Sequence, residues 1–417
     1  MGKTLKRWMA VLLLGVFLLS LEAGWAPVAL GLTSEQQVFN EAWRIVNQAF
    51  VDDSFNHQNW WLVRQKTLKQ PLPDREAAYA AIQSMLASLD DPFTRFLQPA
   101  QYRSLQSTTA GELSGVGLQI GQDPQTQKLE VIAPIEGSPA AGAGLKAHDQ
   151  IWEIDRQSTT TLSLDEAAER MRGPMGSMVE LTIHPADAVN DTDVKQVTLR
   201  RDRIEVNPVY SDLRPQPDGS QIGYIRLRQF NANATRQMQT AIQTLESQGA
   251  TAYILDLRNN PGGLLQAGVD IAQQWLDPSP IVYTLDRLGT LNEFVANRSA
   301  LTHAPLAVLI NQGTASASEI LAGALQDNGR AHLIGERTFG KGSIQSLFDL
   351  SDGSGLAVTI AKYETPLHKD INKIGIEPDQ AVPLKSLGVD QLGTAADSQY
   401  QAAVDFLLTP AVIAGAP

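Results

Sequence analysis

The positions of apolar residues predict a small helical unit near the start of the chain. In TSEQQVFNEAWRIVNQAF, apolar side chains recur every three or four residues from Val38 to Phe50, and a Thr or Ser precedes them as a cap. A second helix is expected in DREAAYAAIQSMLASL. It ends in DDPFTRFL, because Pro92 has no amide donor and disfavours helical geometry in the residue before it. We therefore expect a helical domain over residues 32–105 that carries no chemistry, with the two aspartates before Pro92 as a helix terminus rather than a metal site.

Short strands with alternating apolar residues and glycine turns follow. The loop Gly115, Val116, Gly117, Leu118 stands directly before such a strand, where glycines let backbone amides turn inward as an anion-binding nest. Residues 106–202 resemble a PDZ domain, since this loop matches the carboxylate-binding loop of that family and GSPAAGAGLKAHDQI matches its central signature. The resemblance implies capture of a peptide C-terminus by strand addition, mainly through backbone amides. The alternative is a β-rich spacer.

The remaining chain alternates strands and helices, which predicts a mainly parallel sheet over residues 203–390, followed by a tail over residues 391–417. One strand ends at Asp256 and turns through NNPGG into a helix, and another ends near Asn311 and enters a helix at about Ser316. Sites in open α/β sheets gather where strands end and helices begin. Both turns are therefore candidates for one shared pocket. The fold class expected is α/β and multidomain.

Composition narrows the classes of function. A chain of 417 residues is long enough for two or three domains. Its formal net charge of -12 argues against a nucleic-acid partner, because a phosphate binder needs a basic face. The absence of Cys excludes disulfides, thiolate zinc sites and a Cys nucleophile, and the six His residues show no metal or triad spacing. We expect neither a metal nor a cofactor.

The first residues have the three parts of an export signal. Lys3, Lys6 and Arg7 precede an apolar run over residues 8–21, and small residues follow up to Gly31. A run of about 14 residues is short for a helix that crosses roughly 30 Å of hydrocarbon. We therefore interpret residues 1–31 as a signal peptide, with an uncleaved anchor as the alternative.

The Ser/Thr cluster in GTASASEILAGALQD has a structural and a chemical interpretation. Ser316 can cap the helix while the Glu319 carboxylate reaches back to the Ser316 amide, as in a capping box. Capping does not exclude nucleophilic catalysis, because an N-cap hydroxyl stands at the positive end of the helix dipole. The residues of this segment alone do not decide between Ser316 and Ser318 as a nucleophile.

Lys341 stands between two glycines in TFGKGSIQ, where the backbone can bend and approach another chain segment closely. An extended KGSIQ segment would put Lys341 and Gln345 on one face. A lysine amine activates a serine only when neutral, and at its ordinary pKa only about one in 2,500 is neutral at pH 7. Burial away from carboxylates would lower this pKa by about three units and give a usable base. Otherwise Lys341 is a solvated residue on a turn.

Together these motifs resemble the carboxyl-terminal processing peptidases, serine proteases of the tail-specific type, over essentially the whole mature chain. The motifs that carry the resemblance are GVGLQI, LDLRNNPGGLL, GTASASEILAGALQD, GERTFGKGSIQ, and KYETP with GIEPD. The family separates nucleophile and lysine by 25 residues, which selects Ser316 over Ser318 for pairing with Lys341. The resemblance implies a catalytic Ser316, Lys341 and supporting Gln345, oxyanion amides of Ala317 and Gly262 (or the adjacent Gly263), and a structural or orienting Asp327.

The resemblance also implies a substrate and a place of action. The unit with LDDPFTRFL is similar to the branch of cyanobacteria and chloroplasts, whose members process the C-terminus of the photosystem II reaction-centre precursor in the thylakoid lumen. We expect an exported enzyme of the lumen or periplasm that binds protein C-termini, including those of membrane-protein precursors, and cleaves close to them. Arg172 matches an arginine that links the PDZ domain to the protease core in relatives. Leu367 and His368 depart from the small or polar residues of many relatives at the edge of the cleft.

Three alternatives remain beside this interpretation. They are a general periplasmic tail-specific protease, a PDZ scaffold with an inactive protease domain, and a crotonase-like acyl-CoA enzyme. The export signal, the PDZ-like segment and the Ser/Lys pair argue against the last, and the retained Ser316, Lys341 and Gln345 argue against the scaffold. No G-x-S-x-G elbow suggests a His-dependent hydrolase. The sequence leaves the oligomeric state open.

Overall fold

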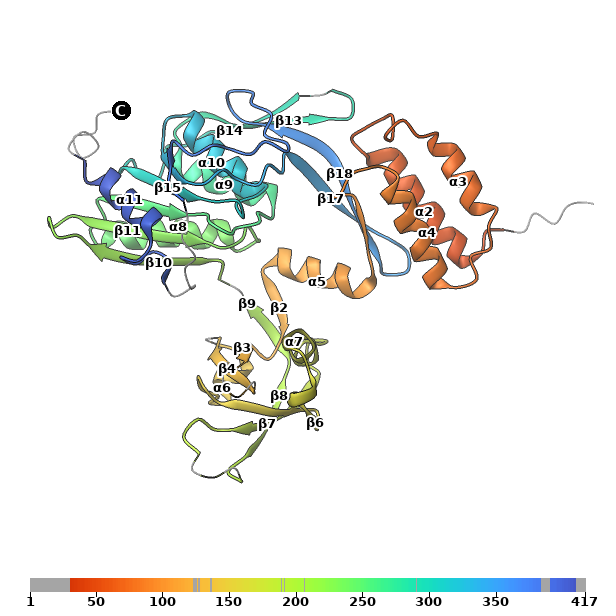
Figure 1. The fold of residues 1–417 in the computed structure, drawn as a ribbon, viewed down its shortest axis with the longest axis horizontal. Coiled ribbons are helices and arrows are strands. Elements are labelled where there is room, and N and C mark those ends of the chain that lie inside the picture. Colours follow the sequence, from red (N-terminus) through yellow and green to blue (C-terminus); the bar gives the residue numbers. More distant parts are fainter. Residues whose placement is uncertain are drawn as a thin grey trace, which may run out of the picture.

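The computed structural model describes residues 31–409, except 123–125, 127, 136, 189, 191, 206, 290 and 384–390. Apart from Gly31, the predicted signal peptide lies outside the described residues, as does the end of the predicted tail. Figure 1 shows a helical N-terminal part, a PDZ-like part that hangs from the rest by two strands, and an α/β core. Within the described residues, every helix is too short or too polar to cross a membrane.

The described residues of the N-terminal part form three helices, of which the sequence pattern predicts the first and third: α2 (Ser34–Ala49), α3 (Trp60–Leu68) and α4 (Arg75–Ala87). Their apolar faces share a core with β18 (Gly355–Glu364), where Leu356 and Val358 are buried with Phe39. After α4 the chain adds a short strand, β1 (Arg95–Leu97), which pairs antiparallel with β18. The N-terminal part is thus joined to the core through both a hydrophobic cluster and a sheet.

A two-stranded ribbon connects the PDZ-like part to the rest of the molecule. Helix α5 (Pro99–Ala110) leads into β2 (Glu112–Gly115), and the chain returns through β9 (Asp202–Glu205). The two strands are antiparallel, and Arg203 and Glu112 form an ion pair across them. The chain therefore enters and leaves the PDZ-like part along the same ribbon (Figure 1).

The PDZ-like part has its own antiparallel sheet and its own core. The sheet has the order β3-β4-β5-β7-β8, with β6 beside β5, so β3 is an edge strand. Val131, Leu181 and Ile183 are among the buried side chains of its core. The elements are β3 (Leu118–Gln122), β4 (Leu129–Pro134), α6 (Pro139–Gly142), β5 (Gln150–Ile154), β6 (Gln157–Ser158), η1 (Thr159–Thr161), α7 (Leu164–Met171), β7 (Met178–His184) and β8 (Lys195–Arg200).

The core contains the mainly parallel sheet that the alternation of strands and helices predicts. Its order is β10-β11-β12-β15-β16-β19, and only β10 runs antiparallel to its neighbour. The strands are β10 (Val209–Pro215), β11 (Gln221–Leu227), β12 (Ala252–Asp256), β15 (Leu306–Ile310), β16 (His332–Gly335) and β19 (Gln380–Ala381).

Helices cover both faces of this sheet. Alternate strand residues such as Leu255 and Val308 face α8 (Ala234–Ser247), α9 (Leu265–Trp275) and α10 (Ala317–Asp327) in one hydrophobic cluster. The other residues of the same strands pack against α11 (Ser398–Leu407) in a second cluster. Helix α11 lies in the segment that the sequence assigns to a tail, so the described end of that segment is part of the folded core.

A second, antiparallel sheet is absent from the sequence-based prediction. Its order is β1-β18-β13-β14, and β17 also pairs with β18. The strands not yet bounded are β13 (Ser279–Asp286), β14 (Leu291–Ala296) and β17 (Ser343–Asp349). Because β17 begins two residues after Lys341, this sheet holds the lysine turn, whose amides contact Glu319 on α10.

Candidate active site

Ser316 occupies a tight turn between β15 and α10. Its backbone has φ of 58° and ψ of -119°, a conformation rare for a residue with a side chain. Ser318, the other candidate, is fully buried, and its hydroxyl donates a hydrogen bond of 3.0 Å to the Asn260 carbonyl oxygen. Ser316 is only partly buried. The geometry therefore leaves the Ser316 hydroxyl as the one a substrate can reach.

The turn after β12 lies directly against the Ser316 turn, as the sequence predicts. The Ala315 amide donates a hydrogen bond of 3.0 Å to the Asn260 carbonyl oxygen. A Cβ atom at Gly262, where φ is 93°, would lie 2.6 Å from the Ala315 carbonyl oxygen and 2.9 Å from the Ala317 amide nitrogen. A side chain at position 262 would therefore cover the Ala317 amide.

The amides of these two turns differ in what they bind. The Gly262 amide donates to the Asn260 side-chain oxygen at 3.0 Å. Neither the Gly263 amide nor the Ala317 amide donates a hydrogen bond to any of the described residues. The Gly263 amide and the Ala317 amide are therefore free to donate to a substrate group beside Ser316.

Glu319 joins the serine turn to the lysine turn. Its carboxylate is fully buried and accepts hydrogen bonds from the Ser316 amide and the Lys341 amide, both at 2.9 Å and both on Oε2. Its other oxygen accepts from the Thr338 hydroxyl at 2.5 Å and the Gly340 amide at 2.8 Å. The hydrogen bond from the Ser316 amide to the Glu319 carboxylate, which the capping box predicts, is confirmed. The sequence did not reveal that the same carboxylate also holds the lysine turn.

Tyr363 adds a second connection between the same turns. It lies on β18 and is buried, its hydroxyl donates to the Ser316 carbonyl oxygen at 3.2 Å, and its amide donates to the Gly342 carbonyl oxygen at 3.1 Å. Burial, reinforced by the Glu319 charge, raises the pKa of the Tyr363 hydroxyl, so it remains a proton donor. The two turns, far apart in sequence, are thereby fixed relative to each other.

The Lys341 amine lies in a largely buried environment. Burial lowers its pKa and the Arg95 charge lowers it further, while Asp91 and Glu319 act in the opposite direction. The sequence interpretation assumed burial away from carboxylates, but two carboxylates, those of Asp91 and Glu319, act on the amine. Its Nζ atom lies 4.9 Å from the centre of the Phe93 ring. Among the described residues it forms no hydrogen bond with Ser316.

Gln345 lies on β17, and its side chain binds Ser343 and Thr359 rather than Lys341. Its side-chain amide donates to the Ser343 hydroxyl at 2.9 Å and to the Thr359 hydroxyl at 3.2 Å. Thr359 in turn donates to the Asp91 carboxylate at 2.6 Å. The parity argument for one shared face does not hold, because Lys341 precedes the strand and the register shifts at Gln345. The sequence missed this link to the N-terminal part.

Asp327 lies at the far end of α10 from Ser316. Its buried carboxylate accepts hydrogen bonds from the Lys369 ammonium at 2.7 Å and from the Leu367 amide at 3.1 Å. Leu367 and His368 belong to the loop that Asp327 holds. This arrangement agrees with an orienting residue for that loop and places no contact between Asp327 and Lys341.

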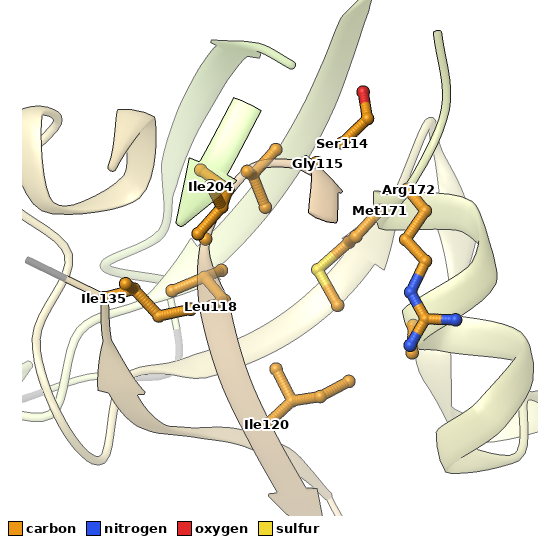
Figure 2. A pocket seen from close by; sticks show the side chains of 11 residues that line it. Ser114, Gly115, Leu118, Ile120, Ile135, Met171, Arg172 and Ile204 are labelled. Atoms are coloured by element: carbon orange, nitrogen blue, oxygen red, sulfur yellow. The ribbon is translucent and has the colours of Figure 1, made fainter. Parts of the chain in front are cut away.

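A second candidate site is the groove of the PDZ-like part, seen in Figure 2. All four residues of the loop Gly115, Val116, Gly117 and Leu118 line it, between the edge strand β3 and helix α7. At Gly117 φ is 76°, and an added Cβ would lie 2.2 Å from the Ser138 Cβ atom, so only glycine fits. Because β3 is an edge strand that lines the groove, its outer side is open to pairing with an added peptide strand.

Arg172 lies at the C-terminal end of α7 on the wall of the same groove (Figure 2). Its side chain is half exposed, and its ion-pair distance to Glu169 is 3.9 Å. Among the described residues, the Arg172 side chain forms no hydrogen bond or ion pair with the protease core. The nearby Arg201, which the sequence did not single out, is buried and donates to the carbonyl oxygens of Arg170, Met171 and Met178.

The comparisons agree with this architecture. A family model described as peptidase family S41 matches residues 221–382, and one described as PDZ domain matches residues 104–184. A carboxyl-terminal-processing protease from Synechocystis sp. is 56% identical over 418 residues, which cover 99% of this chain and 96% of that protein. The chain belongs to peptidase family S41. It is a serine-type carboxyl-terminal-processing protease of that family.

Other members of the family are also similar. The chloroplastic carboxyl-terminal-processing peptidase 2 of Arabidopsis thaliana is 47% identical, with 88% of this chain and 72% of that protein covered. The solved photosystem II D1 C-terminal processing protease has a TM-score of 0.56 at 43% identity, over 84% of this chain and 94% of that chain. A putative S41 protease from Bacteroides fragilis, at 17% identity and a TM-score of 0.54, shares the fold.

Proposed function

We propose that this S41 protease works with Ser316 as nucleophile and Lys341 as general base. Ser316 attacks a peptide carbonyl while the neutral Lys341 amine takes the hydroxyl proton and then passes it to the leaving amine. Water hydrolyses the resulting ester. The observation that carries this proposal is the single Glu319 oxygen on which the Ser316 and Lys341 amides converge. The lowered pKa of Lys341 supports its role as a base.

The Lys341 side chain has to move for this reaction. Its amine lies over Phe93 rather than on the Ser316 hydroxyl. In this proposal the backbone of both turns stays held by Glu319, and rotation of the lysine side chain brings the amine to Ser316. We assign Gln345 a supporting role: its hydrogen bond to Thr359 on β18 fixes β17, the strand that follows the lysine turn.

The oxyanion of the tetrahedral intermediate would bind the Ala317 amide and an amide of the glycine turn. Our assignment of the second donor to Gly262 requires its amide to leave the Asn260 side chain, with which it is paired. The neighbouring Gly263 amide needs no such exchange. Either donor places the carbonyl of the substrate beside Ser316 and at the positive end of α10.

The PDZ-like groove would hold the C-terminus of a protein substrate. A chain added to β3 would place its carboxylate at the amides of the loop over residues 115–118, so cleavage falls close to the substrate end. Arg172 on the groove wall would sense that occupancy and bias the position of the PDZ-like part relative to the core. We assign it a regulatory role on this basis.

The substrate we propose is the precursor of a photosystem II reaction-centre protein, processed after export to the thylakoid lumen or periplasm. The support is the 43% identity to a photosystem II D1 C-terminal processing protease and the chloroplastic relatives. A precursor anchored in the membrane would present its C-terminus as a flexible tail to the groove.

The proposal is tested with two matched peptides derived from such a tail, one with a free C-terminus and one amidated. We expect cleavage of the free peptide and a large loss for the amidated one. Ser316→Ala and Lys341→Ala should each abolish cleavage, with Ser318→Ala as the matched control. Arg172→Ala should impair tail cleavage more than reaction of Ser316 with a small acylating probe. Full activity of Ser316→Ala would remove the dyad, and no cleavage of any peptide by the wild-type protein would favour an inactive scaffold.

A further inference from the structure

The segment Asp91–Arg95 of the N-terminal part reaches the catalytic lysine, although the sequence suggested only a helix end there. It is held rigidly. The Asp91 carboxylate accepts from the Phe93 amide at 3.1 Å and from the Thr94 hydroxyl at 2.6 Å. The Thr94 hydroxyl also accepts from the Thr359 amide on β18 at 3.0 Å. The segment is therefore fixed to the sheet that carries the lysine turn.

This fixation determines where the Phe93 side chain lies. The Lys341 Nζ atom lies 4.9 Å from the centre of the Phe93 ring. Arg95 begins β1 and pairs with Ala357 on β18, the strand that also pairs with β17 beyond the lysine turn. Its positive charge lowers the pKa of the Lys341 amine. The charged groups that act on Lys341 are thus Arg95 on β1, Asp91 before β1 and Glu319 on α10.

We propose that Phe93 and Arg95 are positioning residues for the general base, which seat the Lys341 amine on an apolar face beside a second cation. The ring excludes water from the amine and the guanidinium repels its protonated form, so both favour the neutral base. The attraction of an ammonium for an aromatic face opposes this and holds the side chain in place until substrate enters. The inference rests on the proposed role of Lys341.

The N-terminal part thereby contributes to catalysis and not only to stability. Asp91 connects the segment Asp91–Arg95 to Gln345 on β17 through the Thr359 hydroxyl. The strand that follows the lysine turn and this segment of the N-terminal part are therefore linked by hydrogen bonds. A substitution in the segment would change the ionisation of the base without touching the serine turn.

The first test is the pH dependence of kcat/KM for the free-C-terminus peptide. The acid limb of the pH profile is the range in which activity rises as Lys341 loses its proton. Arg95→Gln should shift this limb to higher pH and leave the plateau at high pH unchanged, because it removes a positive charge that disfavours the Lys341 ammonium. Arg103→Gln, which removes an exposed cation on α5, is the matched control and should leave the limb in place.

The second test separates seating from folding. Burial is the largest cause of the lowered Lys341 pKa, so its loss in Phe93→Ala should outweigh the lost attraction of the ring, shift the acid limb upward and lower kcat. Phe93→Tyr should restore both, since it keeps the ring face. Phe348→Ala removes a partly buried aromatic that packs against the hydrophobic cluster of the N-terminal part, and it is the control for lost packing. A merely structural Phe93 would lower stability like Phe348 and leave the limb unmoved, which would overturn the proposal.

The third test measures the ionisation of the Lys341 amine directly. In the Ser316→Ala background, the rate of Lys341 acetylation by acetic anhydride is followed against pH by mass spectrometry of the Lys341 peptide. Arg95→Gln should move this titration upward in the full-length protein. Unchanged titration and an unchanged acid limb overturn this inference alone. Retained proteolysis in Lys341→Ala would instead overturn the proposed function.

Discussion

Replacement of Asp397 by Ala should destabilise the protease core more than any surface change. Asp397 precedes α11, and its carboxylate is fully buried with that of Asp256 around the equally buried Arg258 guanidinium. Asp397 accepts from Arg258 at 2.7 and 3.0 Å and from three backbone amides, those of Gly393, Gln399 and Tyr400. One side chain therefore caps a helix and pairs a buried cation.

The expected loss follows from these contacts. Removing one partner of a buried ion pair typically costs about 3–5 kcal/mol, because the remaining charge is left unpaired. Arg258 keeps Asp256, at 2.6 Å, which argues for the lower end of that range. The lost cap of α11 adds about 1 kcal/mol. We expect a loss of about 4 kcal/mol in the free energy of unfolding.

The measurement is urea unfolding followed by tryptophan fluorescence. With a slope of about 2 kcal/mol per molar urea, a loss of about 4 kcal/mol lowers the midpoint by about 2 M. The control is Glu377→Ala, which breaks the exposed pair of Arg337 and Glu377 and should cost about 0–1 kcal/mol. A midpoint for Asp397→Ala no lower than that of the control would refute the reasoning.

The same pair gives a pH dependence with a defined sign. Burial alone would raise the pKa of Asp397, but hydrogen bonds from Arg258 and the Gly393 amide, with the Arg258 charge, bring it below the ordinary value. The stabilisation is therefore present above the unfolded pKa of about 3.9 and lost as pH falls through the lower folded value. The stability difference between wild type and Asp397→Ala should shrink only in strong acid.

Three further predictions concern the catalytic centre. Ser316→Ala and Lys341→Ala should lose peptide cleavage yet unfold within about 1 kcal/mol of wild type, as measured by urea unfolding, and a cleaving Ser316→Ala would contradict this. Gly262→Ala should lower kcat by about 10²-fold or more, because its methyl group covers the Ala317 amide, whereas Gly142→Ala, whose methyl meets open space, should not. Activity should rise with pH through an apparent pKa below that of an ordinary lysine and persist in EDTA; loss in EDTA with recovery on adding zinc would contradict it.

Local signals in the sequence predicted the parts of the structure that depend on local rules. Helix α2 follows from apolar spacing and its cap, and the glycine loop before β3 follows from the conformation that only glycine adopts there. The meeting of the turns around Gly262 and Ser316 follows from the alternation of strands and helices. In each case neighbouring residues contain the information.

Long-range contacts were not predictable in the same way. The antiparallel sheet pairs β1 with β18, more than 250 residues apart in sequence, and no local pattern encodes such a partner. Glu319 looked like half of a capping box, yet its second oxygen is used by Thr338 and Gly340. The stretch around Phe93 looked like a helix end, since its role depends on a lysine that only the fold brings near.

The ribbon of β2 and β9 makes the PDZ-like part an insertion with a single attachment. Because the chain enters and leaves through two strands paired from Glu112 to Glu205, the ends of the inserted part are already side by side. Such a geometry lets evolution, or an engineer, exchange the inserted module without rebuilding the protease. Substrate choice and bond cleavage can then diversify separately, in one polypeptide.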